Sequence, residues 1–428
     1  MSEAFATFFE RATGAAPFPY QAAFATAPAP PDLLTVPTGC GKTAAILLSW
    51  LWRRRAAPEE LRATTPRRLI YTLPVRTLVE QTVREARAWM HRLGIEDIGI
   101  HALLGGAVDE VWEAHPERES LLIGTQDQLL SRALMRGYAM SRFRWPIHFA
   151  LLHTDAWWVF DETQLMGPGL STAAQLEGLR RSLGTSLPSR STWMSATNDP
   201  SRLHTIDLRH HPLTGHGLTD ADAAHPDLAR RLRATKTLQV HPVGTDAAQL
   251  ALDLHHEGTR TLLIVNRVAR AIEVFESLQK LLRKARRDVP IRLVHSRFRA
   301  ADRARHQADA LASDFTGIVV ATQAIEAGVD ISSRALLTDI APWSSLTQRF
   351  GRNNRRGEYA EGEASVHVLD LPPKEVAPYT AEALDDARAR LSDLHDVGPA
   401  TLAALPQPAH PPHLPVLRRG RAYDSLDK

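Results

Sequence analysis

A short segment near the start of the chain, VPTGCGKT at residues 36–43, has the composition of a phosphate-binding loop. The apolar runs DLLTV before it and AAILLSWLW after it predict a strand that leads into the loop and a helix that follows it. In that setting backbone N–H groups and the helix N-terminus attract a polyphosphate, Lys42 reaches the outer phosphates, and Thr43 offers a hydroxyl to Mg²⁺. The residues predicted to bind the nucleotide here are Pro37, Thr38, Gly39, Cys40, Gly41, Lys42 and Thr43.

Two adjacent carboxylates, Asp161 and Glu162, follow the apolar run AWWVF at residues 156–160. We expect this strand to lie next to the phosphate-loop strand, so that Asp161 holds Mg²⁺ and Glu162 polarises the attacking water. The amide of Gln164 could hydrogen-bond toward residues 195–197, which follow the run STWM. This pattern predicts a metal-assisted ATPase in which one polar segment couples hydrolysis to strand movement. The predicted coupling residues are Gln164, Ser195, Ala196 and Thr197.

An aromatic segment with one amide, FPYQAAF at residues 18–24, lies upstream of the loop. An amide can pair with both the acceptor and the donor of the adenine edge, and an aromatic ring can stack on its face. The alternative is a plain surface turn. The position of the segment ahead of the phosphate loop favours adenine binding by Phe18, Tyr20 and Gln21.

The second half of the chain carries a basic segment, SLTQRFGRNNRRGE, at residues 345–358. On a helix, Arg352 and Arg355 would lie about one turn apart and could reach the γ-phosphate as arginine fingers. A solvated basic face is the alternative interpretation. Gln348 is expected to act with these arginines, and the preceding segment IVVATQAIEAGVDIS is expected to contribute Gly328 and Asp330 to nucleotide binding.

The elements that must position these residues are short apolar runs that alternate with longer amphipathic ones. This alternation predicts an α/β fold with parallel sheets flanked by helices. The predicted strands of a first unit are DLLTV, RRLIYTL, SLLIGT, AWWVFDE and STWMSA. Those of a second unit are RTLLIVN, IRLVHS, TGIVVAT, ALLTDI and ASVHVLD.

Composition shifts divide the chain into four stretches. Residues 1–198 are expected to form the first domain, with the ATP site. Residues 199–257, rich in His, Pro, Asp and Gly, are expected to be a connector that ends in the first strand of the second domain, TKTLQVH. Residues 258–372 complete the second domain. Residues 373–428 are expected to be one helix and a Pro-rich linker toward an absent domain, because proline at that density interrupts helices and central strands.

The bulk composition restricts the class of protein. No apolar run approaches the roughly 20 residues needed to cross a bilayer, and the N-terminus lacks the pattern of a secretory signal. The single cysteine, Cys40, excludes an internal disulfide and a Cys-based zinc site. We therefore expect a cytoplasmic protein without membrane association. Of six lysines, Lys42 is the only one before residue 236, which suggests that a compact ammonium is required there.

The ordered set PTGCGKT, DETQ, SAT, ATQAIEAGVDIS and QRFGRNNR resembles that of a superfamily 2 helicase with two tandem RecA-like domains. The phrases LLHTDAWWVFDETQLMG and APWSSLTQRFGRNNRRG resemble the CRISPR-associated helicase-nuclease of type I interference systems, of the subtype called U or G. Val36 replaces the usual first glycine of the phosphate loop, a departure that helicase loops tolerate. The resemblance implies ATP and Mg²⁺ as cofactors, movement from 3′ to 5′, and a guide-RNA surveillance complex as partner.

The same resemblance implies a track for single-stranded DNA across both domains. Its contacts should be mainly to phosphate, so that translocation is insensitive to sequence and weakened by salt. In the first domain the matching positions are Pro74, Val75, Arg76, Thr77, Gly105, Gly106, Thr125, Gln126 and Asp127. In the second they are Asn266, Arg267, His295, Ser296, Arg297, Thr322 and Gln323.

The nuclease of that family needs a His, a His-Asp pair and a further Asp to hold metal ions. The only His-Asp dipeptide here, His395-Asp396, is expected to lie inside the charged C-terminal helix, and we interpret it as a chance pair. An HD nuclease domain is therefore expected beyond Lys428 or in a separate chain, and no nuclease activity is expected from this one.

These observations predict an ATP-dependent single-stranded DNA translocase or helicase that unwinds target DNA in type I CRISPR interference. Two alternatives stay open at this point. One is a general superfamily 2 RNA helicase or remodeller, which a strong preference for RNA would indicate. The other is a decayed ATPase that serves as a nucleic-acid-binding scaffold, which an absence of strand-stimulated hydrolysis would indicate.

Overall fold

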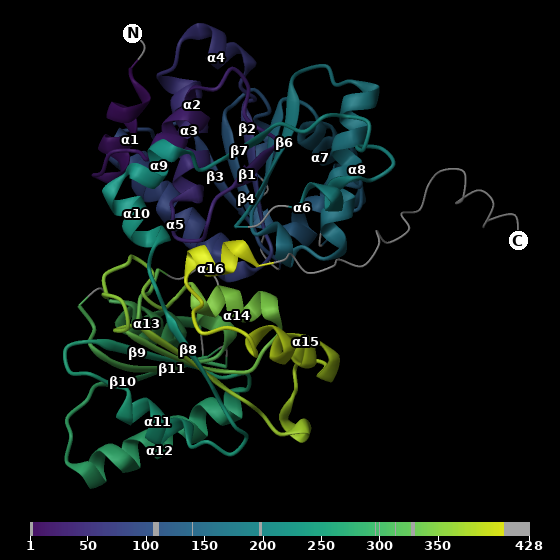
Figure 1. Cartoon of the computed structure of the whole chain (residues 1–428). Helices are drawn as coiled ribbons and strands as arrows, with labels where there is room; N and C mark the ends of the chain where they lie inside the picture. Colours follow the sequence, from purple (N-terminus) through teal and green to yellow (C-terminus); the bar gives the residue numbers. More distant parts are fainter. Residues whose placement is uncertain are drawn as a thin grey trace, which may run out of the picture. The chain divides into compact units, whose positions relative to one another are not determined.

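The computed structural model divides the chain into two compact units, one ending at Asp222 and one running from Ala223 to Leu405 (Figure 1). It describes residues 3–105, 111–138, 140–196, 199–295, 297–298, 300–312, 314–326 and 330–405. Each unit contains one sheet in which all paired strands run parallel. The predicted fold class, two α/β domains with parallel sheets and flanking helices, is confirmed.

The sheet of unit 1 has seven strands in the order β3-β4-β2-β5-β6-β1-β7. The strands are β1 (Leu33–Thr35), β2 (Arg68–Leu73), β3 (Gly99–Leu103), β4 (Ser120–Thr125), β5 (Ala156–Phe160), β6 (Ser189–Ser195) and β7 (Gly215–Gly217). Every residue of β2 and β5 is buried. Continuous apolar strands of this kind form when helices cover both faces of a parallel sheet.

The helices of unit 1 lie on both faces of its sheet (Figure 1). They are α1 (Phe5–Thr13), α2 (Pro19–Thr26), α3 (Lys42–Arg55), α4 (Glu59–Thr64), α5 (Arg76–Leu93), α6 (Gln126–Ala133), α7 (Trp145–His153) and α8 (Pro168–Leu183). Helices α6, α7 and α8 share a core cluster with Ile70, Trp158 and Trp193 of the sheet. Helices α1, α2, α3 and α5 pack together in a second group, in which α5 contacts β2 and β4. Helix α9 (Asp220–Ala224) lies at the boundary of the unit.

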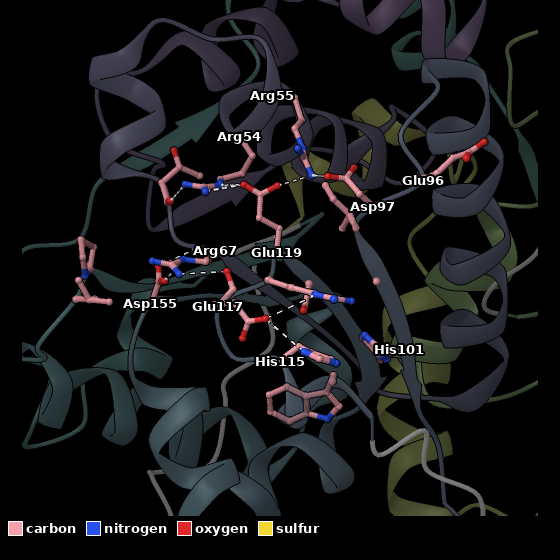
Figure 2. Close-up of a pocket in the computed structure, with 18 of the residues that line it drawn as sticks. Arg54, Arg55, Arg67, Glu96, Asp97, His101, His115, Glu117, Glu119 and Asp155 are labelled. Atoms are coloured by element: carbon pink, nitrogen blue, oxygen red, sulfur yellow. Dashed lines mark hydrogen bonds and ion pairs between the residues drawn. The ribbon is translucent and has the colours of Figure 1, made fainter.

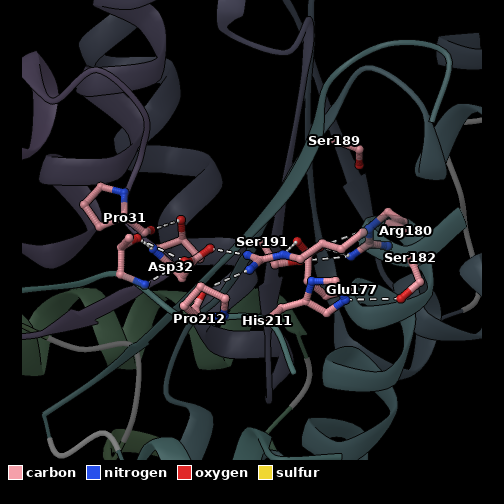
Figure 3. A network of polar contacts seen from close by, with 12 residues as sticks. Pro31, Asp32, Glu177, Arg180, Ser182, Ser189, Ser191, His211 and Pro212 are labelled. Atoms are coloured by element: carbon pink, nitrogen blue, oxygen red, sulfur yellow. Dashed lines mark hydrogen bonds and ion pairs between the residues drawn. The ribbon is translucent and has the colours of Figure 1, made fainter. Parts of the chain in front are cut away.

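A buried ionic network ties α8 to the strands that frame the phosphate loop (Figure 3). The Glu177 carboxylate, on α8, accepts hydrogen bonds from Arg180 at 2.9 Å and from Arg181 at 2.8 Å. It also accepts one from the Ser191 hydroxyl, on β6, at 2.9 Å. Arg181 in turn pairs with Asp32, immediately before β1. Burial opposes ionisation, but the two arginines outweigh it and hold the pKa of Glu177 below its ordinary value.

The sheet of unit 2 has six strands in the order β10-β11-β9-β12-β13-β8. The strands are β8 (Thr237–His241), β9 (Arg260–Ile264), β10 (Ile291–Val294), β11 (Gly317–Ala321), β12 (Ala335–Asp339) and β13 (Ser365–Leu369). The helices are α10 (Pro226–Leu232), α11 (Ala247–Asp253), α12 (Val268–Ala285), α13 (Ala300–Leu311), α14 (Trp343–Phe350), α15 (Ala381–Leu391) and α16 (Pro399–Ala404). Alternate strand residues face opposite sides, as in a pleated strand: Leu263 packs with α11 and α12, whereas Leu262 packs with α14 and α15 (Figure 1).

Two strands were missed by the sequence patterns. β3, GIHAL, is an edge strand of intermediate burial that includes a glycine and a histidine, and β7 has only three residues, GHG. Both lack the apolar run on which a strand prediction rests. The stretch expected to be a connector is shared by both units, because β7 pairs with β1 and β8 pairs with β13.

The helix expected in the C-terminal stretch is present as α15, but it packs within unit 2. Leu384, Ala387 and Leu391 of α15 are buried in a core cluster of unit 2, so the helix is part of that unit. The dipeptide His395-Asp396 follows α15 rather than lying inside it. The Asp396 carboxylate accepts hydrogen bonds from the backbone N–H groups of Lys236 at 2.6 Å and Gly398 at 2.9 Å, which gives it a structural role. The Pro-rich residues 406–428 lie outside the described residues.

None of the helices in the described ranges combines the length and the apolar character that crossing a lipid bilayer requires.

Candidate nucleotide-binding and nucleic-acid site

The predicted phosphate loop connects β1 to α3, as the sequence indicated. Gly39 and Gly41 adopt φ angles of 87° and 84°, a left-handed conformation that glycine accepts without strain. A Cβ atom added to Gly41 would lie 2.6 Å from the Gln21 amide nitrogen. Position 41 therefore requires glycine both for its backbone angle and for the space.

Helix α2 holds this loop from the side. The Tyr20 hydroxyl donates to the Cys40 carbonyl at 2.6 Å, and the Gln21 amide donates to the Gly41 carbonyl at 3.0 Å. The Gln21 side-chain oxygen accepts from the Phe18 N–H at 2.8 Å. Both polar atoms of Gln21 thus contact the protein here, and Tyr20 is fully buried. The structure shows Tyr20 and Gln21 positioning the loop, while their predicted contact with adenine stays a prediction.

Lys42 is the first residue of α3 and is 6% exposed. Its ammonium nitrogen lies 4.0 Å from Glu162 Oε1 and has no hydrogen-bond partner among the described residues. An ammonium can donate three hydrogen bonds, and leaving them unmade in a buried place costs free energy. A buried ammonium without hydrogen-bond partners is expected of a phosphate-binding lysine when no phosphate is bound.

The Asp161 carboxylate is held at both oxygens. Oδ2 accepts from the Tyr71 hydroxyl at 2.8 Å, and Oδ1 accepts from the Glu162 N–H at 2.8 Å. Burial, with the nearby Glu162 charge, raises the pKa of Asp161 from 3.8 to about 6, although Lys42 acts in the opposite direction. An approaching cation would reverse this shift, because it stabilises the ionised carboxylate.

The strand that carries Asp161 does not lie next to the phosphate-loop strand, which corrects our expectation. β6 lies between β1 and β5 and pairs with both. Asp161 still comes near Lys42, because the carboxyl ends of all three strands meet at one edge of the sheet. The insertion of β6 also places its last residue, Ser195, beside the acidic motif.

A chain of hydrogen bonds joins Glu162 to Ser195 through Gln164. The Gln164 amide donates to Glu162 Oε2 at 2.6 Å, and its oxygen accepts from the Ser195 hydroxyl at 2.7 Å. Glu162 has a φ of 52°, an uncommon value for a residue with a side chain. The contact that we predicted for Gln164 is therefore present. Ala196 follows β6 directly, and Thr197 lies outside the described residues.

The side chains present fit a nucleotide with its magnesium ion. A buried orphaned ammonium suits a phosphate oxygen, and the Asp161 carboxylate and the Thr43 hydroxyl are the hard oxygen donors that Mg²⁺ prefers. In the described part of the chain no three His, Cys, Asp or Glu side chains form a group that could hold a metal by themselves. Mg²⁺ in nucleotide sites is usually bound by one or two protein oxygens together with substrate phosphates.

The predicted track residues of unit 1 follow three neighbouring strands. Arg76 begins α5 just after β2, Thr125 ends β4 and precedes α6, and Gly105 follows β3. The order β3-β4-β2 places these strand ends side by side. Arg76 is exposed and pairs with Glu80 at 3.0 Å. Pro74, Val75, Thr77, Gln126 and Asp127 lie at the same strand ends, and Gly106 lies outside the described residues.

The predicted track residues of unit 2 also follow neighbouring strands, β9, β10 and β11, but several are buried. The Asn266 amide donates to the Ile340 carbonyl at 2.8 Å and accepts from Arg349 at 3.0 Å, so its side chain is engaged within the unit. Thr322 and His295 are buried as well. Arg267, which pairs with Glu375, and Arg297 remain more accessible. Gln323 donates to the Asn266 carbonyl, and Ser296 lies outside the described residues.

The basic segment does not form one helix, which corrects our expectation. α14 ends at Phe350, so Arg352 and Arg355 lie in the turns that follow it, whereas Gln348 is on the helix and buried. Arg352 donates to the Glu326 carbonyl at 2.7 Å, and Arg355 pairs with Asp330 at 2.9 Å. Gly351 interrupts the helical run. Gly328 lies outside the described residues.

Three contacts with the predicted motifs were not foreseen from the sequence. Tyr71 binds Asp161, and Glu326 accepts from both Arg349 and Arg352. Tyr71 could be noticed as the one phenol in the apolar run RRLIYTL, but its partner depends on strand order. Glu326 lies among small residues of the ATQAIEAG run, which carries no comparable signal.

A pocket of about 940 Å³ lies away from these motifs, at the amino-terminal edge of the unit 1 sheet (Figure 2). Its charged side chains pair with one another: Arg54 Nε lies 2.6 Å from Glu119 Oε1, and Arg67 Nε lies 2.9 Å from Asp155 Oδ2. None of the predicted site residues lines it. The candidate nucleotide site is therefore separate from this pocket.

Family models match segments of both units. A DEAD/DEAH box helicase family model matches residues 21–206, and a model of the C-terminal part of the CRISPR-associated nuclease/helicase Cas3 matches residues 257–358. A putative CRISPR-associated nuclease/helicase Cas3 from Myxococcus xanthus is 28% identical over 431 residues, which cover 97% of this chain and 54% of that protein. The chain thus spans about half the length of that curated relative.

Solved structures show the same fold at low sequence identity. The DUF1998 helicase MrfA bound to DNA has a TM-score of 0.62 at 16% identity, covering 92% of this chain and 54% of that one. T. fusca Cas3 has a TM-score of 0.59 at 20% identity, covering 89% and 49%, and has also been solved with AMPPNP. In sequence and in fold, across both of its units, this chain resembles the Cas3-type helicases of superfamily 2.

Proposed function

We propose that this chain is an ATP-dependent single-stranded DNA translocase, the helicase part of a type I CRISPR effector that acts in the cytoplasm. The observation that carries the ATPase part is the buried Lys42 ammonium, which faces the Asp161–Glu162 pair without a hydrogen-bond partner in the described chain. Such an arrangement lowers the stability of the fold in the absence of a ligand. A bound phosphate would remove this destabilisation by accepting hydrogen bonds from the ammonium.

In the proposed reaction Lys42 and the amides of the phosphate loop bind the β- and γ-phosphates, and α2 keeps the loop in place through Tyr20 and Gln21. Asp161 and Thr43 would hold Mg²⁺, which when bound neutralises charge on the phosphate oxygens. Glu162 orients and polarises the attacking water. Its carboxylate is steadied by the Gln164 amide, so that movement of Ser195 is transmitted to Glu162.

Single-stranded DNA is proposed to bind at the carboxyl edges of the two sheets. Exposed Arg76 in unit 1 and Arg297 in unit 2 supply positive charge there. Asn266 and Thr322 are buried, so they would affect DNA binding only by holding the backbone at the strand ends in place. Contacts of this kind are made to phosphate and weaken as salt rises. The preference for DNA, the 3′ to 5′ direction and a guide-RNA surveillance complex as partner rest on the likeness to Cas3 proteins.

The test compares ATP hydrolysis in the presence of single-stranded DNA and of RNA of matched length. For Lys42→Ala and Glu162→Gln we expect turnover to fall by about 10²- to 10³-fold, since each removes one group that acts on the developing charge or on the water. Lys280→Ala, an exposed lysine on α12, is the matched control and should keep parental turnover.

Three outcomes would contradict parts of the proposal. Parental turnover in both site variants would show that the assigned site is wrong. Stronger stimulation by RNA than by DNA would favour the general RNA helicase or remodeller. Strand binding without any stimulated hydrolysis would favour the scaffold.

A further inference from the structure

Tyr71 lies on β2, which runs between β4 and β5, the strand of the acidic motif, and is fully buried. Its hydroxyl donates to Asp161 Oδ2 at 2.8 Å. Thr43 is a neighbour of the same phenol. One phenol therefore binds Asp161, which offers oxygen ligands to a magnesium ion, and it comes from a strand that carries neither Asp161 nor Thr43.

The phenol stays protonated in this environment. A tyrosine hydroxyl ordinarily ionises only near about pH 10, so at neutral pH it keeps its proton. A neutral hydroxyl beside a carboxylate serves as a hydrogen-bond donor. Together with the Glu162 N–H at Oδ1, it fixes the orientation of the Asp161 carboxylate while lone pairs remain free on both oxygens.

We propose that Tyr71 is a positioning residue that sets the magnesium affinity of the nucleotide site by orienting the Asp161 carboxylate. This inference rests on the proposed function. Groups that hydrogen-bond to metal ligands orient them, and their loss typically weakens metal binding by about 10- to 100-fold. Tyr71 is proposed to contact no substrate, so its effect reaches the metal only through the Asp161 carboxylate.

The experiment measures equilibrium binding of a fluorescent ADP analogue, mant-ADP, to the full chain as Mg²⁺ is titrated, and again in EDTA. In Tyr71→Phe the ring still fills its place, but the donor is lost. We expect the Mg²⁺ concentration at half-maximal binding to rise about tenfold or more, whereas binding in EDTA changes less than about twofold. Tyr138→Phe, at a tyrosine 58% exposed in the same unit, is the matched control and should behave as the parent.

A second substitution separates loss of the donor from disturbance of the core. Replacing Tyr71 with 4-aminophenylalanine restores a donor at the same place, and we expect it to recover most of the magnesium dependence of the parent. An unchanged magnesium dependence in Tyr71→Phe would overturn the inference. So would an equal loss of binding with and without Mg²⁺, which indicates a structural role only. A parent that binds no nucleotide with Mg²⁺ would instead overturn the proposed function.

Discussion

The carboxyl edges of the two sheets carry similar residue types but satisfy them differently. In unit 1 the Lys42 ammonium lacks a hydrogen-bond partner within the described residues, and burial raises the pKa of Asp161. In unit 2 Arg349 is 0% exposed and donates to Glu326 at 2.7 Å, to the Thr338 hydroxyl at 2.7 Å and to Asn266 at 3.0 Å. The Lys42 ammonium of unit 1 makes no hydrogen bond within the described residues, whereas this arginine of unit 2 is engaged by its own unit.

The difference shows that motif membership does not reveal what a charged residue contacts. Arg349, Arg352 and Arg355 belong to one basic segment, yet their partners are the partly buried Glu326 carboxylate, a carbonyl and the more exposed Asp330. Burial opposes ionisation of Asp330, but Arg355 and Arg356 outweigh it and lower its pKa. The three arginines should therefore affect stability to very different extents.

The largest effect on stability is expected for Arg349→Ala. Removing it leaves Glu326 and Asn266 without their partner inside unit 2, and breaking a buried ion pair in this way costs about 3 to 5 kcal/mol. Native-state hydrogen exchange of the β9 and β12 amides measures this loss. Arg230→Ala is the control, since Arg230 and Asp227 are both more than half exposed and such pairs contribute under about 1 kcal/mol. If Arg349→Ala loses as little stability as Arg230→Ala, Arg349 does not stabilise the fold of unit 2 in the way that the comparison of the two sheet edges predicts.

A smaller effect, of opposite sign, is expected for Asp161→Asn without nucleotide and in EDTA. The pKa of Asp161 is raised from 3.8 to about 6, so the folded chain binds the proton more tightly than the unfolded chain. The contribution of this group to folding is therefore present below about pH 4 and is lost as the pH rises through about 6. The variant should be more stable than the parent by about 3 kcal/mol near pH 8, a difference that closes toward about pH 4.

Urea denaturation followed by tryptophan fluorescence measures this difference, because eight of the nine tryptophans lie before residue 223. Glu60→Gln, at an exposed carboxylate of the same unit, is the matched control variant. If Asp161→Asn is less stable than the parent at every pH, the ionised Asp161 carboxylate does not destabilise the fold in the absence of a cation.

The smallest effect is expected for Arg355→Ala. Its partner Asp330 has a side chain that is 57% exposed, and Arg356 binds the same carboxylate at 2.9 Å. We expect a loss of about 1 kcal/mol or less, because solvent screens such pairs. The same hydrogen-exchange measurement in unit 2 tests this value. A loss as large as that of Arg349→Ala would place Arg355 among the residues that hold the unit together.

Much of the fold and the local arrangement of the candidate nucleotide site could be predicted from the sequence, because the signals are local. A glycine-rich loop between a strand and a helix needs only neighbouring residues to form, and continuous apolar runs such as AWWVF mark buried parallel strands. The edge strand β3 and the three-residue β7 were missed because their sequences contain no such run. The helix expected across Arg352 and Arg355 ended instead at Phe350, next to Gly351.

The sequence by itself determined which residues could do chemistry here: Lys42 in its loop, the acids Asp161 and Glu162, and an amide at Gln164. Only the tertiary structure decided their partners. β6 lies between β1 and β5 and so brings Ser195 to Gln164, and β2 lies beside β5 and so brings Tyr71 to Asp161. The physical reason is that hydrogen bonds depend on distances between strands far apart in the chain, which strand order fixes and local spacing does not.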